Sequence, residues 1–103
     1  MIRINNILST IFEDVKLFEL KSFNDDRGSF TETYNREIQT IIGNKINFVQ
    51  DNESISSHGV LRGLHYQKKP YEQSKLVRVS SGEIQDVIVD LRKTSETYGK
   101  WES

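Results

Sequence analysis

Residues 48–67 read FVQDNESISSHGVLRGLHYQ, and the rest of the chain is best interpreted outward from this stretch. Its second half has the composition of a strand over residues 60–66. Because alternate residues of a strand share a face, Leu61, Gly63 and His65 would point to one side of it. A titratable imidazole on one face of a sheet is the arrangement that a proton-transfer site needs.

The preceding residues predict a hairpin and one short helix. The strand and turn signals are residues 15–20, the NDDRG turn at 24–28, and residues 29–34. Asn35 can then cap a helix that carries isoleucines on one side and ends at Gly43. Residues 1–14 show no clean periodicity, so we expect an arm with a short strand there.

Further short strands are predicted in the second half of the chain. Residues 46–53 resume an extended pattern, residues 68–74 read as a loop around the only proline, and a strand-like segment ends at Trp101. Residues 75–79 and 83–91 predict a hairpin through the SSG turn. Short strands at even spacing with one small helix indicate an all-β fold, an antiparallel β-sandwich or barrel.

Length and composition exclude several classes of protein. At 103 residues with 35% hydrophobic content, the chain forms one domain at most, and we interpret it as incomplete or dependent on a partner. Its net charge of −1 includes no basic block, so we expect no nucleic acid polymer as a partner. The absence of cysteine excludes a disulfide framework and a thiolate nucleophile. With neither a signal peptide nor a membrane helix in the pattern, we expect no membrane association and a cytoplasmic location.

His65 is the candidate base. Arg62 and Lys75 place positive charge near it in the sequence, and this charge would keep the imidazole neutral. A base beside a fixed cation suits removal of a proton from a carbon next to a carbonyl, because the cation stabilises the developing enolate oxygen. The alternative is a hydrogen-bonded histidine at a strand end with two solvated cations, and spacing alone leaves it open.

Other candidate groups have weaker signals. The interval from Gly59 to His65 begins like the first metal motif of the cupin barrels, but Gln67 stands where its second histidine would fall, so we expect no metal site. Arg27 and Glu32 flank the predicted bend, where the arginine could bind a phosphate or a carboxylate. The alternative is that they are a turn arginine and an exposed glutamate of a strand. Two aspartates on the last predicted strand, Asp86 and Asp90, are expected to be partly buried structural partners of arginines.

Four motifs closely resemble the dTDP-4-dehydrorhamnose 3,5-epimerase family. They are DDRGSFTETYN at 25–35, the stretch at 48–67, KLVRVSSGEIQDVIVDLR at 75–92 and SETYGKW at 95–101. The resemblance implies a cofactor-independent homodimeric enzyme of dTDP-L-rhamnose synthesis on a cupin-type jelly roll. Its substrate would be a dTDP-linked 4-keto-6-deoxyhexose, inverted at C3 and C5.

The resemblance also implies roles for individual residues. His65 would take the proton beside the C4 ketone, Lys75 would stabilise the enolate, and Arg62 would contact the phosphates. The remaining contacts to the nucleotide part of the substrate would come from Arg27, Glu32, Gln50, Asp51 and Asn52.

Family chains continue beyond the matched motifs, and their second half supplies an orienting aspartate, a second histidine and a tyrosine acid that have no counterparts here. We therefore expect residues 1–103 to be the N-terminal part of a single epimerase cupin domain, apparently truncated. The alternatives that stay open are a non-catalytic dTDP-sugar-binding module or a truncated inactive fragment, and a 3-epimerase or ketoisomerase on the same fold.

Overall fold

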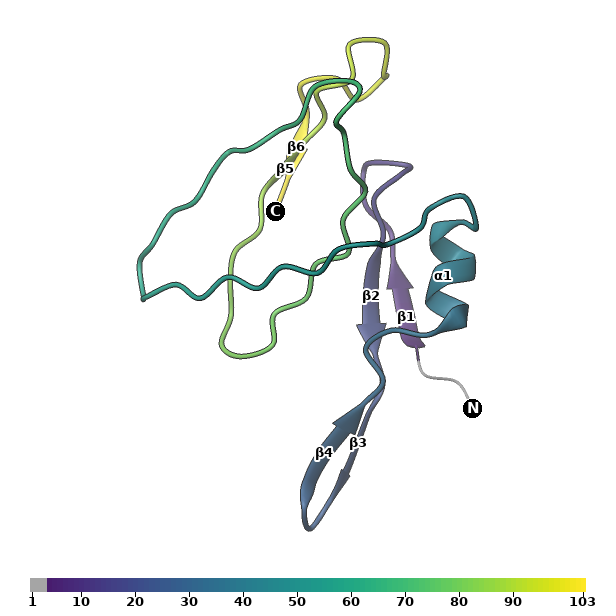
Figure 1. Cartoon of the computed structure of the whole chain (residues 1–103), viewed down its shortest axis with the longest axis vertical. Coiled ribbons are helices and arrows are strands. Elements are labelled where there is room, and N and C mark those ends of the chain that lie inside the picture. Colours follow the sequence, from purple (N-terminus) through teal and green to yellow (C-terminus); the bar gives the residue numbers. More distant parts are fainter. Residues whose placement is uncertain (1–3) are drawn as a thin grey trace.

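The structure is a computed structural model that describes residues 4–103. These residues form three antiparallel sheets of two strands each, one short helix, and long irregular segments between them (Figure 1). The expected all-β class with one short helix is confirmed. The cupin-type jelly roll stays a prediction, because two-stranded sheets alone do not distinguish it from other β architectures.

The first sheet pairs β1 (Ile4–Leu8) with β2 (Leu17–Leu20), in a register that sets Leu8 opposite Leu17. The Thr10 hydroxyl organises the connection, because it accepts from the Phe12 N–H at 3.1 Å and lies 2.9 Å from the Val15 carbonyl. Phe12 is buried beneath this turn. The strand predicted over residues 15–20 is confirmed over 17–20, and its partner is β1 rather than the strand beyond the NDDRG turn. β1 confirms the short strand predicted in the N-terminal arm, of which residues 1–3 lie outside the described residues.

The second sheet is a hairpin of β3 (Ser22–Asp25) and β4 (Gly28–Thr31), and its tip projects away from the other elements (Figure 1). Asp25 faces Gly28 across the tip, so the predicted NDDRG turn is confirmed. Gly28 has φ +128°, a left-handed value that only glycine adopts without strain. β4 ends earlier than the predicted strand, at Thr31.

Helix α1 (Arg36–Ile42) follows, with both of its predicted ends confirmed. The Asn35 side chain accepts a hydrogen bond from the Ile38 N–H at 3.0 Å, which satisfies one of the free donors of the first turn. At the other end, Gly43 has φ +121° and donates its N–H to the Gln39 carbonyl. Ile38 is 1% exposed, so this short helix buries one side chain fully.

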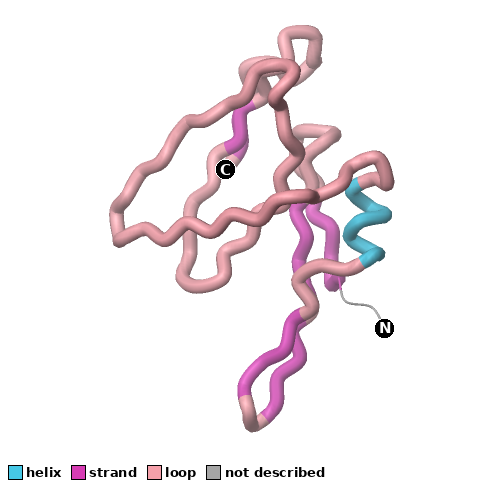
Figure 2. The backbone as a smooth tube through the Cα atoms, viewed as in Figure 1, coloured by secondary structure: helices cyan, strands magenta, loops and turns pink. Residues whose placement is uncertain are grey.

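Residues 43–87 form no strand, and several predictions are wrong there. Figure 2 shows this stretch as continuous loop between α1 and β5. The predicted strand over residues 60–66 is absent, as is the predicted hairpin of residues 75–79 with 83–91. Instead β5 (Ile88–Val89) pairs with β6 (Trp101–Glu102). A strand is defined by ladder bonds to a neighbour, and no described residue provides that neighbour for residues 43–87.

The apolar core is small for a chain of this length. The buried hydrophobic side chains among residues 4–103 are Ile4, Phe12 and Ile38. The radius of gyration is 15.7 Å, whereas a compact domain of this length has about 13 Å. Large hydrophobic side chains of the loop region are exposed instead, and Leu61 is 91% exposed. Within the described residues, no helix has the length and apolar character needed to cross a bilayer.

Candidate functional site

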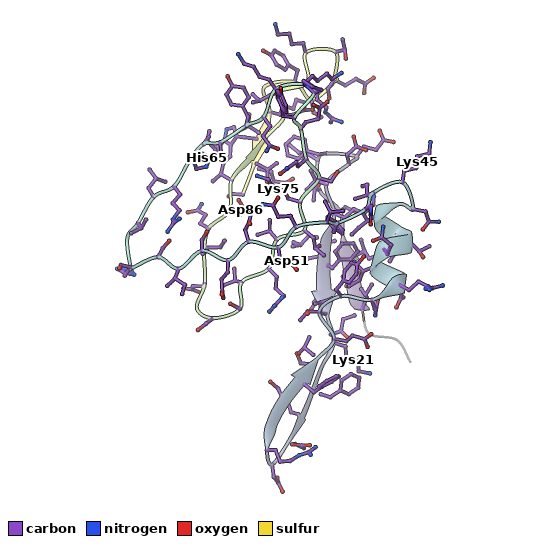
Figure 3. All side chains as sticks on the ribbon, viewed as in Figure 1. Lys21, Lys45, Asp51, His65, Lys75 and Asp86 are labelled. Atoms are coloured by element: carbon purple, nitrogen blue, oxygen red, sulfur yellow. The ribbon has the colours of Figure 1, made fainter. Side chains whose placement is uncertain are left out.

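His65 lies in the long loop region between α1 and β5, with its side chain exposed (Figure 3). Gly63, two residues before His65, has φ +113°. A Cβ built on Gly63 would lie 3.4 Å from Nδ1 of the imidazole. Lys75 belongs to the same loop region and is also exposed. Within residues 4–103 no hydrogen bond joins His65 to Lys75, so their cooperation stays a prediction.

Arg62 is held by its own loop. Its Nε donates to the Ser56 hydroxyl at 2.9 Å, and its Nη2 donates to the Ile55 carbonyl at 3.0 Å. These bonds close the loop that contains the turn at His58 and Gly59. A guanidinium has five N–H donors. Three of the five make no hydrogen bond to residues 4–103, and they are available for an anionic ligand.

Gln50, Asp51 and Asn52 are exposed neighbours on one extended segment. The Gln50 Nε2 donates to Asn52 Oδ1 at 3.1 Å, which couples the two amides. Residues two apart on an extended segment share a face, so Asp51 points to the other side. The predicted set of three polar side chains is therefore divided between one amide pair and one separate carboxylate.

Arg27 stands at the tip of the β3–β4 hairpin, where sequence reasoning missed its partner. The Asp25 carboxylate accepts from the Arg27 backbone N–H at 2.8 Å and from its Nη2 at 2.5 Å. These hydrogen bonds lower the pKa of Asp25 and raise that of Arg27. The Arg27 side chain is still 90% exposed. The signal that could have revealed the pair was the aspartate two residues before an arginine in a turn. Glu32 follows β4 and is half-buried.

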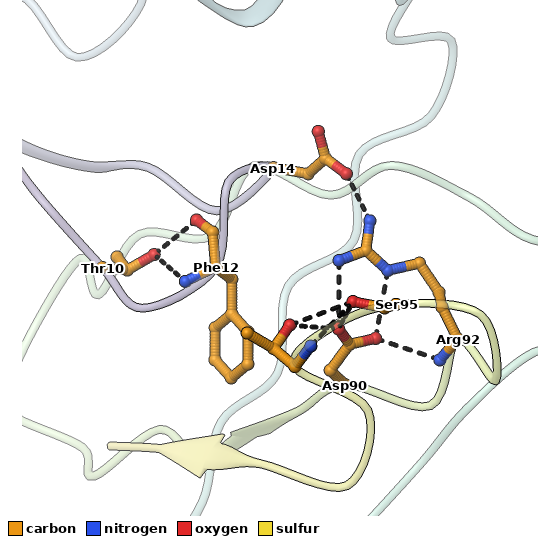
Figure 4. Close-up of polar contacts among 7 residues, drawn as sticks. Thr10, Phe12, Asp14, Asp90, Arg92 and Ser95 are labelled. Atoms are coloured by element: carbon orange, nitrogen blue, oxygen red, sulfur yellow. Dashed lines mark hydrogen bonds and ion pairs between the residues drawn. The ribbon is translucent and has the colours of Figure 1, made fainter.

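The densest polar cluster lies elsewhere, around Asp90 (Figure 4). Its buried carboxylate accepts from the Arg92 N–H and Nε, both at 3.0 Å, and from the hydroxyls of Ser95 and Thr97, both at 2.6 Å. Hydrogen bonds from Arg92, then from the two hydroxyls, hold the pKa of Asp90 far below its ordinary value. The expectation that Asp90 is an arginine's structural partner is confirmed. The same expectation for Asp86 is wrong, because Asp86 is exposed.

Arg92 also connects the segment after β5 to the β1–β2 connection. Its Nη1 donates to the Asp14 carboxylate in the β1–β2 connection, and hydrogen bonds from both aspartates raise its pKa. Nearby, Glu102 Oε2 accepts from the Ile11 N–H at 3.0 Å. A cavity of about 380 Å³ opens beside the cluster, lined by Ile11, Glu13, Arg92, Thr94, Ser95, Glu96 and Thr97. No predicted site residue lines it.

The predicted site residues are thus distributed over two regions. Arg27 and Glu32 belong to the hairpin and its exit, and the others belong to the long loop region. Among residues 4–103, no three histidine, aspartate or glutamate side chains come together as a group able to hold a metal ion.

Comparison with known proteins identifies the family. Residues 9–103 match the family model described as dTDP-4-dehydrorhamnose 3,5-epimerase. Proteins of that name are 54% identical in Shigella flexneri over 93% of this chain and 53% identical in Methanothermobacter thermautotrophicus over 91%. A further protein of that name, from Escherichia coli, is 48% identical over 93%.

The matched regions are 54%, 50% and 52% of these three proteins, so the chain spans about half the length of the curated relatives it matches. The family model nevertheless covers all but the first eight residues of this chain, including every predicted site residue. The chain therefore belongs to the dTDP-4-dehydrorhamnose 3,5-epimerase family.

Proposed function

We propose that this chain takes part in epimerisation of dTDP-4-dehydro-6-deoxy-D-glucose at C3 and C5, giving dTDP-4-dehydro-L-rhamnose. The observation that carries the proposal is the family match over residues 9–103, since the related proteins carry the name of this activity. We also propose the cupin-type jelly roll as the parent fold and a homodimer as the assembly.

The proposed chemistry starts at the carbon beside the C4 ketone. The His65 imidazole takes the proton from this carbon, and the electron pair moves into the carbonyl to form an enolate. The Lys75 ammonium stabilises the negative oxygen, which is where charge develops in the transition state. A proton from solvent then adds to the opposite face of the carbon and inverts the centre, while the proton on His65 passes to solvent. The proposed reaction steps use no cofactor.

The proposed binding contacts use the donors that remain available. The three N–H groups of Arg62 that make no internal hydrogen bond suit the diphosphate, because a guanidinium matches phosphate oxygens in geometry and charge. Arg27 has an exposed side chain at the hairpin tip and can contact the nucleotide with Glu32. The coupled amides of Gln50 and Asn52, with Asp51, provide donors and acceptors for the base.

Exchange of solvent deuterium into the keto-sugar tests the proposal. The chain is incubated with substrate in D₂O, and proton NMR follows loss of the signals at C3 and C5. We expect exchange with the unsubstituted chain and a loss of about 10²- to 10⁴-fold with His65→Asn, the range that a general base contributes. His58→Asn is the matched control, because His58 is an exposed imidazole of the same loop region.

Each other result has a definite meaning. Undiminished exchange with His65→Asn would remove His65 from the mechanism. Deuterium at C3 alone would identify a 3-epimerase, and a migrated keto group would identify a ketoisomerase. Absence of exchange in the unsubstituted chain would show that these 103 residues do not catalyse the reaction by themselves.

One observation favours a second candidate, a non-catalytic dTDP-sugar-binding module. The cationic residues assigned to the ligand are exposed, whereas no hydrogen bond within residues 4–103 joins His65 to Lys75. Titration with dTDP, followed by amide chemical shifts, separates the candidates. A binding module shifts the amides near Arg62 with dTDP and shows no deuterium exchange.

A further inference from the structure

The half-buried side-chain amide of Gln39, on helix α1, binds three different groups. Its Nε2 donates to the carbonyl of Gly43 at 3.1 Å and to the carbonyl of Ile46 at 2.7 Å. Its Oε1 accepts from the Tyr34 hydroxyl. Because a glutamine amide has two N–H donors and one carbonyl oxygen, both donors and the oxygen have partners.

These hydrogen bonds close the turn that follows α1. The backbone contributes one bond across this turn, from the Ile46 N–H to the Gly43 carbonyl at 3.1 Å. Among residues 4–103, the Ile46 carbonyl accepts from no backbone N–H, so the Gln39 side chain provides its bond. The direction in which the chain leaves the turn therefore depends on Gln39.

The same amide also fixes an aromatic contact farther along the chain. The rings of Tyr34 and Phe48 meet edge to face, with centroids 6.1 Å apart and planes at 84°. This geometry is favourable for two aromatic rings. Because the Tyr34 hydroxyl donates to Gln39, the segment after the turn is anchored at two points, the Ile46 carbonyl and the Phe48 ring.

The anchored segment continues directly into the amide pair assigned to the nucleotide. Alternate residues of an extended segment share a face, so Phe48, Gln50 and Asn52 lie on one side of it. The Gln50 Nε2 donates to Asn52 Oδ1 at 3.1 Å. Figure 3 places Lys45 in the turn after α1 and Asp51 on the segment that leaves it. The position of Phe48 therefore determines where the two amides point.

We propose that Gln39 is a positioning residue, which orients the amides of Gln50 and Asn52 toward a nucleotide base by anchoring Ile46 and Phe48. The proposal rests on the proposed function, in which these two amides contact the base of dTDP. Its structural part, the anchoring, is measurable without a ligand. The two parts can therefore fail separately.

Gln39→Glu tests the proposal, because it keeps the size of the side chain and replaces its N–H donors by an oxygen that faces two carbonyls. We expect the Kd of dTDP to rise about tenfold, the effect of losing one or two hydrogen bonds to the base. The Kd of inorganic pyrophosphate should stay unchanged, because the diphosphate is assigned to Arg62. Titrations followed by amide chemical shifts measure both constants.

Thr40→Glu is the matched control. It adds the same negative charge to the next residue of α1, at an exposed side chain. The Thr40 hydroxyl donates to the Arg36 carbonyl at 2.9 Å within the helix, so the substitution removes no hydrogen bond to Gly43 or Ile46. Thr40→Glu should leave the Kd of dTDP and the Kd of pyrophosphate unchanged.

NMR spectra without ligand measure the anchoring itself. In the unsubstituted chain, the side-chain amide protons of Gln39 should exchange with solvent more slowly than in the urea-denatured chain. Nuclear Overhauser effects should connect the rings of Tyr34 and Phe48. Gln39→Glu should remove these effects and shift the side-chain amide signals of Gln50 and Asn52, whereas Thr40→Glu should preserve both.

Three results would overturn the proposal. The first is a folded Gln39→Glu variant that weakens dTDP and pyrophosphate equally, or weakens neither. The second applies even if that variant does not fold: Gln39 amide protons that exchange in the native unsubstituted chain as fast as in the denatured chain would mean that the amide anchors nothing. The third is a folded Gln39→Glu variant with unchanged amide signals of Gln50 and Asn52.

Kinetics of deuterium exchange into the keto-sugar separate positioning from chemistry. Because Gln39 is assigned to base binding alone, we expect Gln39→Glu to raise KM and to leave kcat near the value for Thr40→Glu. A fall in kcat with KM unchanged would contradict the positioning role. If the unsubstituted chain does not bind dTDP, the proposed function fails for this chain, while the amide signals of Gln50 and Asn52 still decide the anchoring.

Discussion

Asp90 illustrates how one side chain acquires a strongly altered acidity. Its two carboxylate oxygens accept hydrogen bonds from Arg92, Ser95 and Thr97 while the side chain is only 3% exposed. Each of these bonds favours the ionised form, and together they outweigh the opposing effect of desolvation, so the pKa falls. Asp25 shows the same direction with Arg27 as the cause, although its side chain is 50% exposed.

These two aspartates predict a stability that depends on acid pH. A carboxylate whose pKa is lower in the folded than in the unfolded state stabilises the fold above its unfolded pKa of about 3.9. That stabilisation is lost as the pH falls through the folded value. We therefore expect the midpoint of urea unfolding, followed by both circular dichroism and tryptophan fluorescence, to stay constant from pH 7 to 5 and to decrease steadily below pH 4.

Substitution of Asp90 identifies the group responsible. Asp90→Asn should lower the midpoint at pH 7 and flatten its decrease below pH 4, because the neutral amide no longer titrates. Asp26→Asn is the control, since the Asp26 side chain makes no hydrogen bond or ion pair with residues 4–103. Equal slopes below pH 4 in the unsubstituted chain and in Asp90→Asn would contradict the assignment.

For single residues, the sequence predicted an interaction correctly where the two partners are close along the chain and carry opposite charges. Asp90 was expected to pair with an arginine, and it does so two residues along the chain. The Ser95 and Thr97 hydroxyls were not predicted, because a loop conformation brings them back to the carboxylate and no periodicity encodes that return. The roles of His65 and Lys75 stay predictions, since both depend on a substrate and on contacts between distant segments.

At the scale of elements, the sequence predicted correctly those helix ends and turns that depend only on neighbouring residues. Asn35 and Gly43 delimit α1 as predicted, because both act within one turn of the helix. The NDDRG turn likewise produces the β3–β4 hairpin. Residues 60–66 have strand composition and yet form no strand, because pairing requires a neighbour that the residue pattern cannot provide. Period-two alternation therefore indicates that these residues can adopt a strand, but a strand forms only where a second segment pairs with them.

The capping of α1 gives a prediction at this scale. Asn35→Ala removes the acceptor for the Ile38 N–H and should lower the free energy of unfolding by about 1 kcal/mol. Asn35→Asp keeps an acceptor and should preserve most of that stability. Thermal melts followed at 222 nm measure both variants. Equal melting temperatures for Asn35→Ala and Asn35→Asp would show that the side-chain cap does not stabilise this helix.

The whole molecule exposes more apolar surface than a stable monomer normally does. Val49, Ile55 and Leu61 are 84%, 86% and 91% exposed, although their residue types favour burial. The buried apolar set of Ile4, Phe12 and Ile38 lies outside residues 43–87. Surface of this kind is a site of association, because burial of apolar area is the main favourable contribution to protein contacts.

We therefore expect the chain to self-associate in a concentration-dependent way. Sedimentation velocity between micromolar and hundred-micromolar concentrations should show a shift from monomer to a larger species. Leu61→Asp should weaken this shift, because it places a charge in exposed apolar surface. Thr94→Asp is the control, since Thr94 is exposed and belongs to the polar loop after β5. A monomer at every concentration would exclude association through this surface.

The pairing of β5 with β6 has a consequence for optical measurements. Trp101 is the only tryptophan of the chain, and it stands in β6 opposite Val89 with 63% of its surface exposed. Its fluorescence therefore senses the environment of the C-terminal sheet, whereas ellipticity at 222 nm senses α1. Because few buried side chains connect these regions, a free energy derived from the indole signal describes one end of the molecule rather than the whole.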